Sequence, residues 1–511
     1  MAVFSLEIGD YDKKLLAKGK GSIFVCNQLL PGSDAPVLFS VLEAQFDHVR
    51  ILHPYPTAPS KSMREHTIQP KGGRIENAFF TNRFIKKLKK TVESGLAVGL
   101  VLNFSDNPLS HLGKNILRDQ ILRQLRRTGL PITPIHLQTE HMPGGWLRRA
   151  IPGLPHHFTG GRIHVNVRVG NTINPEVIQA FPKNRLWGKF LQAKIFSLGS
   201  SFDVHPELFT GPKPAAQLPL AEPVDPVVIA AEIAALPEAK IVAKRGEFDV
   251  IIASFQSLPH TLFEIARLRE LTFRTVGEGT GKPRDMDEFD MYYLQLIIWD
   301  REKKRIAGGY RLGLGDQIFE RFGVNGFYTA SLFKMKKEFH EVLQQSVELG
   351  RTYVIPEYQK HRLPLFLLWK GILLFLLANP KFRYLLGPVS ISKDYSEASK
   401  GVIVEFVKRF FFDRKLSRYV EPRKPFRPQI KDVDTGLLAE SLHGQFDALE
   451  AMIESMEPRH FSVPVLFKQY LRQNAKFVAF NVDPNFSDCL DGLMILDIAE
   501  LPASTLEALQ Q

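Results

Sequence analysis

Hydrophobic residues in the first 210 positions gather in short runs separated by polar segments with helical spacing. Two runs, Ser22 to Cys26 and Gly99 to Phe104, are continuous and apolar, as in strands buried on both faces. Ile85 to Ser94 and Ile116 to Arg127 space their apolar residues as helices do, and Pro131 to Leu137 is another apolar run that ends in a loop. Strand and helix alternate, so the pattern predicts an α/β domain.

Longer strands and helices alternate in the rest of the chain. Two expected strands, Tyr293 to Asp300 and Arg305 to Leu314, are joined by the charged turn Arg301-Glu302-Lys303-Lys304, as in a hairpin. The other expected elements are helices at Val227 to Leu236, Leu262 to Phe273, Phe339 to Gln345 and from Leu365, and strands at Phe248 to Ala253 and Val347 to Val354. This order predicts a mixed α+β domain but does not decide its function.

One break in composition divides the chain. Gly211 to Pro226 is dense in proline and alanine, which favours an extended, semi-rigid connector. We therefore expect one domain at residues 1–210, a linker at 211–226 and a second domain at 227–511.

The most apolar stretch is Leu363 to Ala378, which Pro364 and Lys370 interrupt. It falls short of the ~20 residues that a membrane-spanning helix needs, so we expect a buried helix. The first twenty residues carry acidic side chains and lack the apolar core of a secretory signal, so a cytoplasmic location is expected. Peripheral attachment to a membrane stays possible on this evidence.

The overall composition is that of a globular protein with a basic surplus. The chain has 511 residues, 66 Lys+Arg against 54 Asp+Glu and a net charge of +12. It contains only two cysteines, Cys26 and Cys489, which excludes a disulfide framework or a cysteine-rich metal site and fits a reducing compartment. The surplus of cations suits nucleic acid, a membrane surface or an acidic partner.

Several charged residues lie in or beside the expected strands of the second half, where an unpaired buried charge is costly. Each taken alone fits an ordinary structural ion pair, but their order along the chain is more specific. They are Arg269 in LRELTF, Asp287 and Asp290 in DMDEFD, Arg311 in YRL, and Glu348 and Arg351 in VELGRTYV.

The series LRxxxF, DxxD, YRL and ExxRxxV resembles the acyl-homoserine-lactone synthases. It is more closely similar to the N-acyltransferases that make ornithine lipids and related aminolipids, within the GNAT superfamily. The phrases MDEFDMYYLQLIIWD, GGYRL, FYTASLF, ELGRTYV and LLWKGI carry this resemblance over residues 248–412, and residues 464–497 are similar to a segment of hemolysin-like proteins grouped with these enzymes. The resemblance implies a GNAT-like mixed-sheet domain.

Roles for individual residues follow from this resemblance. It implies that Glu348 accepts a proton from the amine of an amino-acid acceptor, with Arg351 beside it, because a buried acid can have a pKa near neutrality. Arg269, Phe273, Asp287, Asp290 and Arg311 would shape the acceptor pocket. No metal or redox cofactor is implied.

The donor side departs from enzymes of the superfamily that bind coenzyme A. Their Gln/Arg-x-x-Gly-x-Gly/Ala loop cradles a pyrophosphate, whereas this chain has Gln359-Lys360-His361-Arg362-Leu363-Pro364 and lacks both small residues. The related enzymes take acyl chains from acyl carrier protein, whose phosphopantetheine has one phosphate and whose surface is acidic. The resemblance thus implies that Gln359, Lys360, His361 and Arg362 bind an acyl-carrier-protein donor, although a solvated helix start fits each residue equally well.

The first domain is similar, more weakly, to glycerolipid O-acyltransferases that acylate lysophosphatidic acid. Their Asn-His-x-x-x-x-Asp signature is replaced here by Asn27-Gln28 with Asp34 one residue further on, and glutamine has no basic lone pair to accept a proton. The resemblance therefore implies a degenerate acyltransferase fold that binds a membrane, an acyl chain or a partner, unless another histidine such as His111 or His136 serves as the base. An ester-linked second chain would then need a separate O-acyltransferase.

Other features carry less chemistry. The histidines His136, His141, His156 and His157 and the late aspartates lack metal-ligand spacing, and Gly277 to Gly281 is interpreted as a flexible segment over the acceptor pocket. Basic and aromatic residues mix at Arg83 to Lys90 and Val407 to Arg418, which favours an anionic membrane surface. No nucleic-acid-binding motif accompanies them, so nucleic acid is not the expected partner.

The leading hypothesis is an N-acyltransferase that moves a 3-hydroxyacyl chain from acyl carrier protein to the α-amine of ornithine or a similar amino acid. A synthase of a diffusible N-acyl amino acid or lactone signal is the alternative within the same fold. A catalytically inactive, membrane-associated scaffold is the alternative of another class.

Overall fold

The structure is a computed structural model that describes residues 4–29, 34–52, 63–68, 82–104, 111–139, 163–200, 217–361, 363–428, 430, 432–457, 461–484, 486, 488–503, 505 and 507. The chain forms two compact units. Unit 1 comprises Met1–His205, Ser396–Glu405 and Gln429–Ser462, and unit 2 comprises Pro206–Tyr395, Phe406–Pro428 and Val463–Gln511. The division is therefore not one cut at residues 211–226, because two late segments of the chain pack with the first unit.

Unit 1 is built on a seven-stranded sheet in the order β1-β7-β6-β2-β5-β3-β4. All neighbouring strands are parallel except β6 and β7. The strands are β1 (Phe4–Ile8), β2 (Ile23–Asn27), β3 (Val49–Leu52), β4 (Thr67–Ile68), β5 (Ala97–Leu102), β6 (Ile132–Thr139) and β7 (Ile163–Val169). The central β2 and β5 are buried along their whole length, as their continuous apolar runs predicted.

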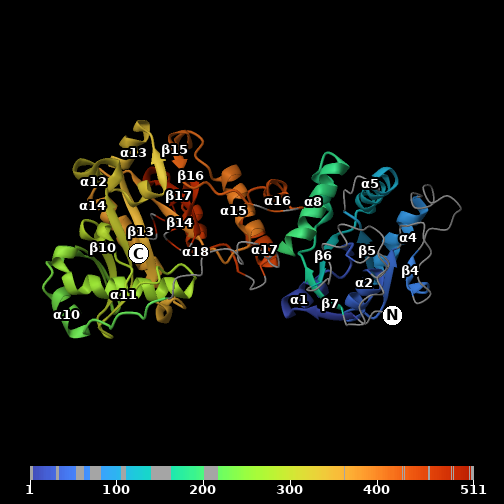
Figure 1. Ribbon diagram of the computed structural model, residues 1–511, viewed down its shortest axis with the longest axis horizontal. Coiled ribbons are helices and arrows are strands. Elements are labelled where there is room, and N and C mark those ends of the chain that lie inside the picture. Colours follow the sequence, from blue (N-terminus) through green and yellow to red (C-terminus); the bar gives the residue numbers. More distant parts are fainter. Residues whose placement is uncertain are drawn as a thin grey trace. The chain divides into compact units, whose positions relative to one another are not determined.

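Helices cover this sheet, and the α/β class expected for the first half is confirmed (Figure 1). They are α1 (Asp10–Lys18), α2 (Asp34–Glu43), α4 (Asn82–Glu93), α5 (His111–Thr128), α7 (Pro175–Ala180) and α8 (Asn184–Ser197), joined by α16 (Thr435–Glu440) and α17 (Phe446–Met456) from late in the chain. Long-range hydrogen bonds hold the late segment, since Arg168 Nη2 donates to the Ser455 carbonyl at 2.8 Å and Asn171 Nδ2 to the Ala451 carbonyl at 2.7 Å.

Unit 2 contains an eight-stranded mixed sheet in the order β16-β17-β14-β13-β11-β10-β9-β8 (Figure 1). The strands are β8 (Ile241–Arg245), β9 (Phe248–Ser254), β10 (Leu294–Asp300), β11 (Arg305–Leu314), β13 (Ser346–Val354), β14 (Tyr384–Ile391), β16 (Lys476–Asp483) and β17 (Cys489–Asp497). The predicted hairpin of β10 and β11 is confirmed, and its tight turn places Lys304 at a φ of 48°.

The helices of unit 2 are mostly those that apolar spacing predicted. They are α10 (Pro226–Ala234), α11 (Pro259–Thr275), α12 (Gly315–Phe322), α13 (His340–Gln344), α14 (Leu363–Ala378), α15 (Glu397–Phe410), whose last residues belong to this unit, and α18 (Val465–Arg472). The apolar α14 packs on β8, β9, β10 and β11, which explains its composition. Within the described ranges, no helix combines the length and hydropathy required to cross a bilayer.

The strands β13 and β14 are the only neighbouring parallel pair of this sheet, and they stay together only briefly. Their pairing covers Ser346 with Tyr384, Val347 with Leu385 and Glu348 with Leu386. Beyond Glu348, β13 continues to pair with β11 and β14 continues to pair with β17. The two strands thus separate in the middle of the sheet, and among the described residues the β14-facing edge of β13 has no strand partner from Gly350 onward.

Close backbone packing at the point of separation requires a glycine. A Cβ atom on Gly387 of β14 would collide with the Leu349 carbonyl oxygen of β13, whereas a Cβ on Gly350 would meet nothing within 4 Å. We expect Gly387→Ala to lower the free energy of unfolding by about 1–3 kcal/mol, as for other overpacked sites. Gly350→Ala is the matched control and should be close to neutral in the same urea titration. Equal stability of the two variants would contradict this account of the opening.

Candidate active site

The candidate site begins with an arginine that is fully buried in unit 2. Arg269 on α11 donates from Nη1 and Nη2 to the two carboxylate oxygens of Asp290, both at 2.8 Å. Its Nη2 also donates to the Asp285 carbonyl, and its Nε lies 3.3 Å from Asp285 Oδ2. Such a two-point pair fixes orientation as well as charge. Arg269 therefore anchors α11 to the segment 285–290 that precedes β10.

Asp290 is held in its ionised form by this arrangement. Burial raises the pKa of Asp290, but the charges and hydrogen bonds of Arg269 and the charge of Arg311 outweigh burial, so the pKa is lowered overall. The side chain also accepts from the Asp287 N–H at 3.1 Å and from Gln295 Nε2 at 3.2 Å. Asp290 is thus a structural anion, satisfied on both oxygens.

Arg311 of β11 lies under three aromatic rings. Its Nη1 donates to Asp287 Oδ1 and lies 3.5 Å from Asp290 Oδ1. Its guanidinium carbon lies 5.3 to 5.7 Å from the ring centroids of Phe289, Tyr293 and Tyr328. Within the part of the chain that the structure describes, its Nε and Nη2 have no hydrogen-bond partner, although the side chain is 1% exposed. Two buried N–H donors are therefore left for a ligand.

Arg351 completes the group immediately beyond the point where β13 leaves β14. Its φ of 51° is a left-handed backbone conformation, which is unusual in a strand. Nε lies 3.0 Å from Asp285 Oδ2, and Nη2 lies 3.4 Å from Asp287 Oδ2. The guanidinium also stacks between the rings of Tyr328 at 4.9 Å and Phe486 at 4.8 Å.

The structure thus gathers all the charged acceptor-side residues that the sequence singled out. Phe273 joins them indirectly, because its ring packs edge-on against Phe486 at 5.3 Å. Three further members were missed: Asp285, Tyr293 and Tyr328. Tyr293 and Tyr328 occur in the phrases that carried the resemblance and Asp285 directly precedes one of them, but nothing in their spacing distinguished them from core residues.

Glu348 is buried at the last position where β13 pairs with β14, and its carboxylate is saturated with donors. Oε1 accepts from the Thr329 N–H at 2.8 Å and from the Thr329 hydroxyl, while Oε2 accepts from the Tyr328 N–H at 3.0 Å and from the Tyr293 hydroxyl. A carboxylate offers about four acceptor positions, so all are occupied. This geometry anchors the turn at 328–331. The role of proton acceptor stays a prediction.

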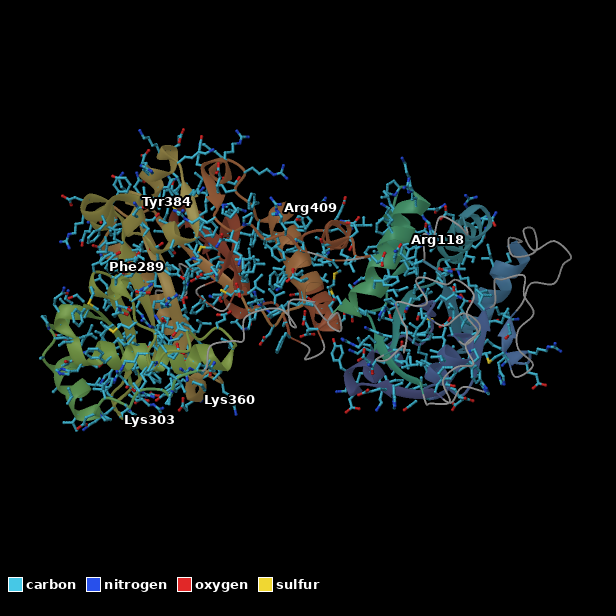
Figure 2. The ribbon with its side chains drawn as sticks, in the orientation of Figure 1. Arg118, Phe289, Lys303, Lys360, Tyr384 and Arg409 are labelled. Atoms are coloured by element: carbon cyan, nitrogen blue, oxygen red, sulfur yellow. The ribbon has the colours of Figure 1, made fainter. Side chains whose placement is uncertain are left out.

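The donor-side residues lie at the other end of β13. Gln359 donates to the Val354 carbonyl at 2.8 Å, His361 lines a cavity of about 500 Å³, and Lys360 is exposed beside it, while Arg362 lies outside the described residues. The rest of the cavity lining is Glu247, Phe248, Lys303, Arg305, Glu357, Tyr358, Leu363 and Pro364. Figure 2 shows Lys303 and Lys360 at the edge of unit 2. Lys303 and Arg305 thus line a cavity whose other lining residues are acidic, aromatic and aliphatic.

Gln28 and Asp34, which the resemblance to O-acyltransferases singled out, do not form an acid–base pair. Asp34 begins α2, and its Oδ1 accepts from the Leu29 N–H at 2.9 Å, which closes the loop after β2. Gln28 is half-buried and its backbone N–H donates to the Leu102 carbonyl at 2.9 Å. Burial lowers the pKa of His136 to about 4, with a further contribution from the charge of Arg168, so this histidine stays neutral. The side chain of His111 and residues His141, His156 and His157 lie outside the described part.

Two other sequence features, the basic and aromatic segment 407–418 and the candidate metal ligands, can be compared with the structure. In residues 407–418, the cations are exposed but Phe410, Phe411 and Phe412 are half-buried, and Phe411 and Phe412 pair with the backbone of Phe477. Membrane attachment by this segment stays a prediction. Among the described residues, no group of three or more His, Cys, Asp or Glu is placed to hold a metal ion.

Comparisons with known proteins identify the type of domain that contains the arginine and aspartate network. Residues 268–369 match the sequence profile of the acetyltransferase (GNAT) domain. A glycine N(alpha)-acyltransferase of Phocaeicola vulgatus is 29% identical over 251 residues, which are 47% of this chain and 76% of that protein. A glycine N(alpha)-acyltransferase of Bacteroides thetaiotaomicron is 29% identical over 280 residues, which are 52% of this chain and 81% of that protein.

Among solved structures, a CoA-dependent acyl-homoserine lactone synthase with SAM and isopentyl-CoA matches 51% of this chain and 87% of its own, at 11% identity and a TM-score of 0.27. The matched GNAT profile begins just before Arg269 and ends within α14, so it encloses the arginine and aspartate network and β13, whereas β14 lies beyond it. The chain therefore contains a GNAT acetyltransferase domain and is an N-acyltransferase enzyme.

Proposed function

We propose that this protein transfers an acyl chain from a carrier-bound thioester to the α-amine of a small amino acid, with glycine as the first candidate. The observation that carries the proposal is the opening between β13 and β14 next to the buried arginine network. Backbone N–H groups on the free edge of β13 are suited to polarise a thioester carbonyl, because they are fixed before the reaction begins.

The acceptor side of the opening suits an amino acid. Arg311 has two unpartnered, buried N–H donors, and guanidinium groups bind carboxylates in preference to most other anions. Glycine comes first because both similar curated proteins are named for it. Ornithine is the second candidate, on the sequence phrases shared with aminolipid enzymes. Both acceptors have the α-amine and carboxylate that the proposal requires.

Acyl carrier protein is the proposed donor. The turn between β10 and β11 and the start of α14 both bring cations to the cavity at the donor end of β13. Lys303, Arg305 and His361 line that cavity, and a carrier protein with an acidic surface would be attracted to them. The absence of the two small residues that a coenzyme A pyrophosphate loop requires supports the same donor.

The acceptor is tested with purified full-length protein, an acyl-carrier-protein donor and a panel of amino acids. We expect N-acylglycine to form fastest, followed by N-acylornithine, as measured by mass spectrometry of the products. Acylation of glycine methyl ester should be slower by tenfold or more, because the ester cannot pair with Arg311. No N-acyl product with any amino acid would refute the proposal.

The position of Glu348 predicts a loss of stability when its charge is removed. In Glu348→Gln the side-chain NH₂ group would face a hydroxyl or N–H donor, so we expect the free energy of unfolding to fall by about 1–3 kcal/mol in urea titrations. Glu338→Gln, an exposed substitution of the same type, is the control and should be neutral. If Glu348→Gln keeps wild-type stability but loses activity more than a hundredfold, Glu348 is the proton acceptor and not an anchor.

Reversal of charge beside the donor cavity tests the carrier. We expect Lys360→Glu to reduce kcat/KM for acyl carrier protein roughly tenfold at low salt, because long-range attraction raises the association rate. The same variant should use a small acyl-pantetheine donor as well as the wild type does. Lys334→Glu, an exposed reversal outside the cavity lining, is the control. An equal loss with both donors would place Lys360 in the general active site instead.

A further inference from the structure

A second buried acid faces the opening from the β14 side. Glu278 lies just after α11, where Gly277 takes a φ of 75° and the Glu278 N–H donates to the Phe273 carbonyl at 3.0 Å. The Ser390 hydroxyl of β14 donates to Glu278 Oε2 at 2.9 Å. This serine belongs to the part of β14 that no longer pairs with β13. Glu278 is therefore held at the opening by both its backbone and its side chain.

The strand register places this acid on the same face of the sheet as the arginine network. Glu348 pairs with Leu386, and Ser390 follows Leu386 by four residues, so side chains at these positions share one face. Asp491 of β17 pairs with Ser390 and points to that face as well. Asp483 of β16 lies nearby, because it accepts from the Tyr328 hydroxyl at 3.0 Å. Tyr328 also contacts Arg351 and Arg311.

On the described part of this face, two acids lack a cationic partner and one arginine has donors without an acceptor, which together fit a zwitterionic ligand. Among the described lysines and arginines, none forms an ion pair with Glu278 or Asp491. Independently, the Nε and Nη2 donors of the 1% exposed Arg311 have no partner there. An amino acid would supply both missing groups, an ammonium for the acids and a carboxylate for Arg311.

We propose that Glu278 is the catalytic base, whose carboxylate accepts a proton from the ammonium group of the amino-acid acceptor. The inference rests on the proposed N-acyl transfer and goes beyond it by naming the group that activates the nucleophile. Ser390 is then a positioning residue that orients the carboxylate toward the opening.

The electrostatic surroundings make Glu278 suitable for this role. Burial raises the pKa of Glu278, the Ser390 hydrogen bond lowers it and the charge of the nearby Asp394 raises it, so that the pKa is about 7 overall. Burial, together with the charges of Asp483 and Glu278, also raises the pKa of Asp491 well above its usual range. Burial and the same acids keep Cys489 a thiol. A base with a pKa near the working pH is the efficient choice.

The reaction balances with these groups. Glu278 takes one proton from the ammonium, and the neutral amine attacks the thioester carbonyl to form the C–N bond. The tetrahedral intermediate then breaks its C–S bond, and the second nitrogen proton passes to the leaving thiolate. Amide and free thiol are the products, and Glu278 releases its proton to solvent. One proton is released per turnover.

The pH dependence of the full-length enzyme tests the proposal. In the wild type, kcat/KM should rise as pH passes through about 7, as Glu278 becomes ionised, which is well below the titration of a free amino-acid amine. Glu278→Gln should lose this rise and reduce the rate by about 10²- to 10⁴-fold. Asp394→Asn removes a charge that raises the pKa of Glu278, so the rise should move to lower pH while the plateau rate is retained. A wild-type profile in Glu278→Gln, or no shift in Asp394→Asn, would overturn the proposal.

Thermal unfolding gives a readout that does not depend on activity. A carboxyl whose pKa is raised in the folded state stabilises the fold below pH 4.5 and loses that contribution as pH rises to about 7. The melting temperature of Glu278→Gln relative to wild type should therefore increase between pH 5 and pH 8. If this increase occurs but the pH–rate profile is unchanged, Glu278 titrates without serving as the base, and the proposal fails. If the wild type acylates no amino acid, the proposed function fails, independently of this measurement.

Discussion

Three guanidinium groups, those of the buried Arg269 and Arg311 and of Arg351, whose side chain is 11% exposed, impose the main constraint on unit 2. Each would cost several kcal/mol if it were left unpaired in the interior, so the segment 285–290 must supply carboxylates to all three at once. That segment joins α11 to β10 and cannot move without breaking pairs on β11 and β13. The network therefore holds α11 over the sheet at the place where β13 and β14 separate.

The two buried glutamates on this face, Glu348 and Glu278, have different surroundings, which suit them to different roles. Glu348 lies where the strands are still paired and accepts from two N–H groups and two hydroxyls, which fix its carboxylate in place. Glu278 lies where the strands have separated, accepts from Ser390 and has acidic neighbours. The four donors around Glu348 stabilise an ionised carboxylate. The buried, acidic surroundings of Glu278 favour a carboxyl group that exchanges a proton with a ligand.

Sequence reasoning predicted what is encoded locally. The apolar runs of β2, β5 and β11 and the helical spacing of α11 and α14 are properties of short windows, and the structure confirms them. The charged positions from Arg269 to Arg351 were found because their order is distinctive. The domain division could not be predicted in full, because Arg168 meets Ser455 across 287 positions of sequence. Similarly, Glu278 became a candidate only when the fold brought Ser390 to it.

The cations of unit 2 fall into two groups that act over different distances. The three arginines of the network are at most 11% exposed and pair with carboxylates, so they contribute little to the field outside the protein. Lys360 and the cations of the β10–β11 turn are exposed, so they act over a distance of about one Debye length, ~8 Å at physiological salt. Recognition of the acceptor should therefore depend weakly on salt and recognition of the donor strongly. Unequal salt dependence of the two KM values would follow from this difference in burial when the donor carries an acidic surface.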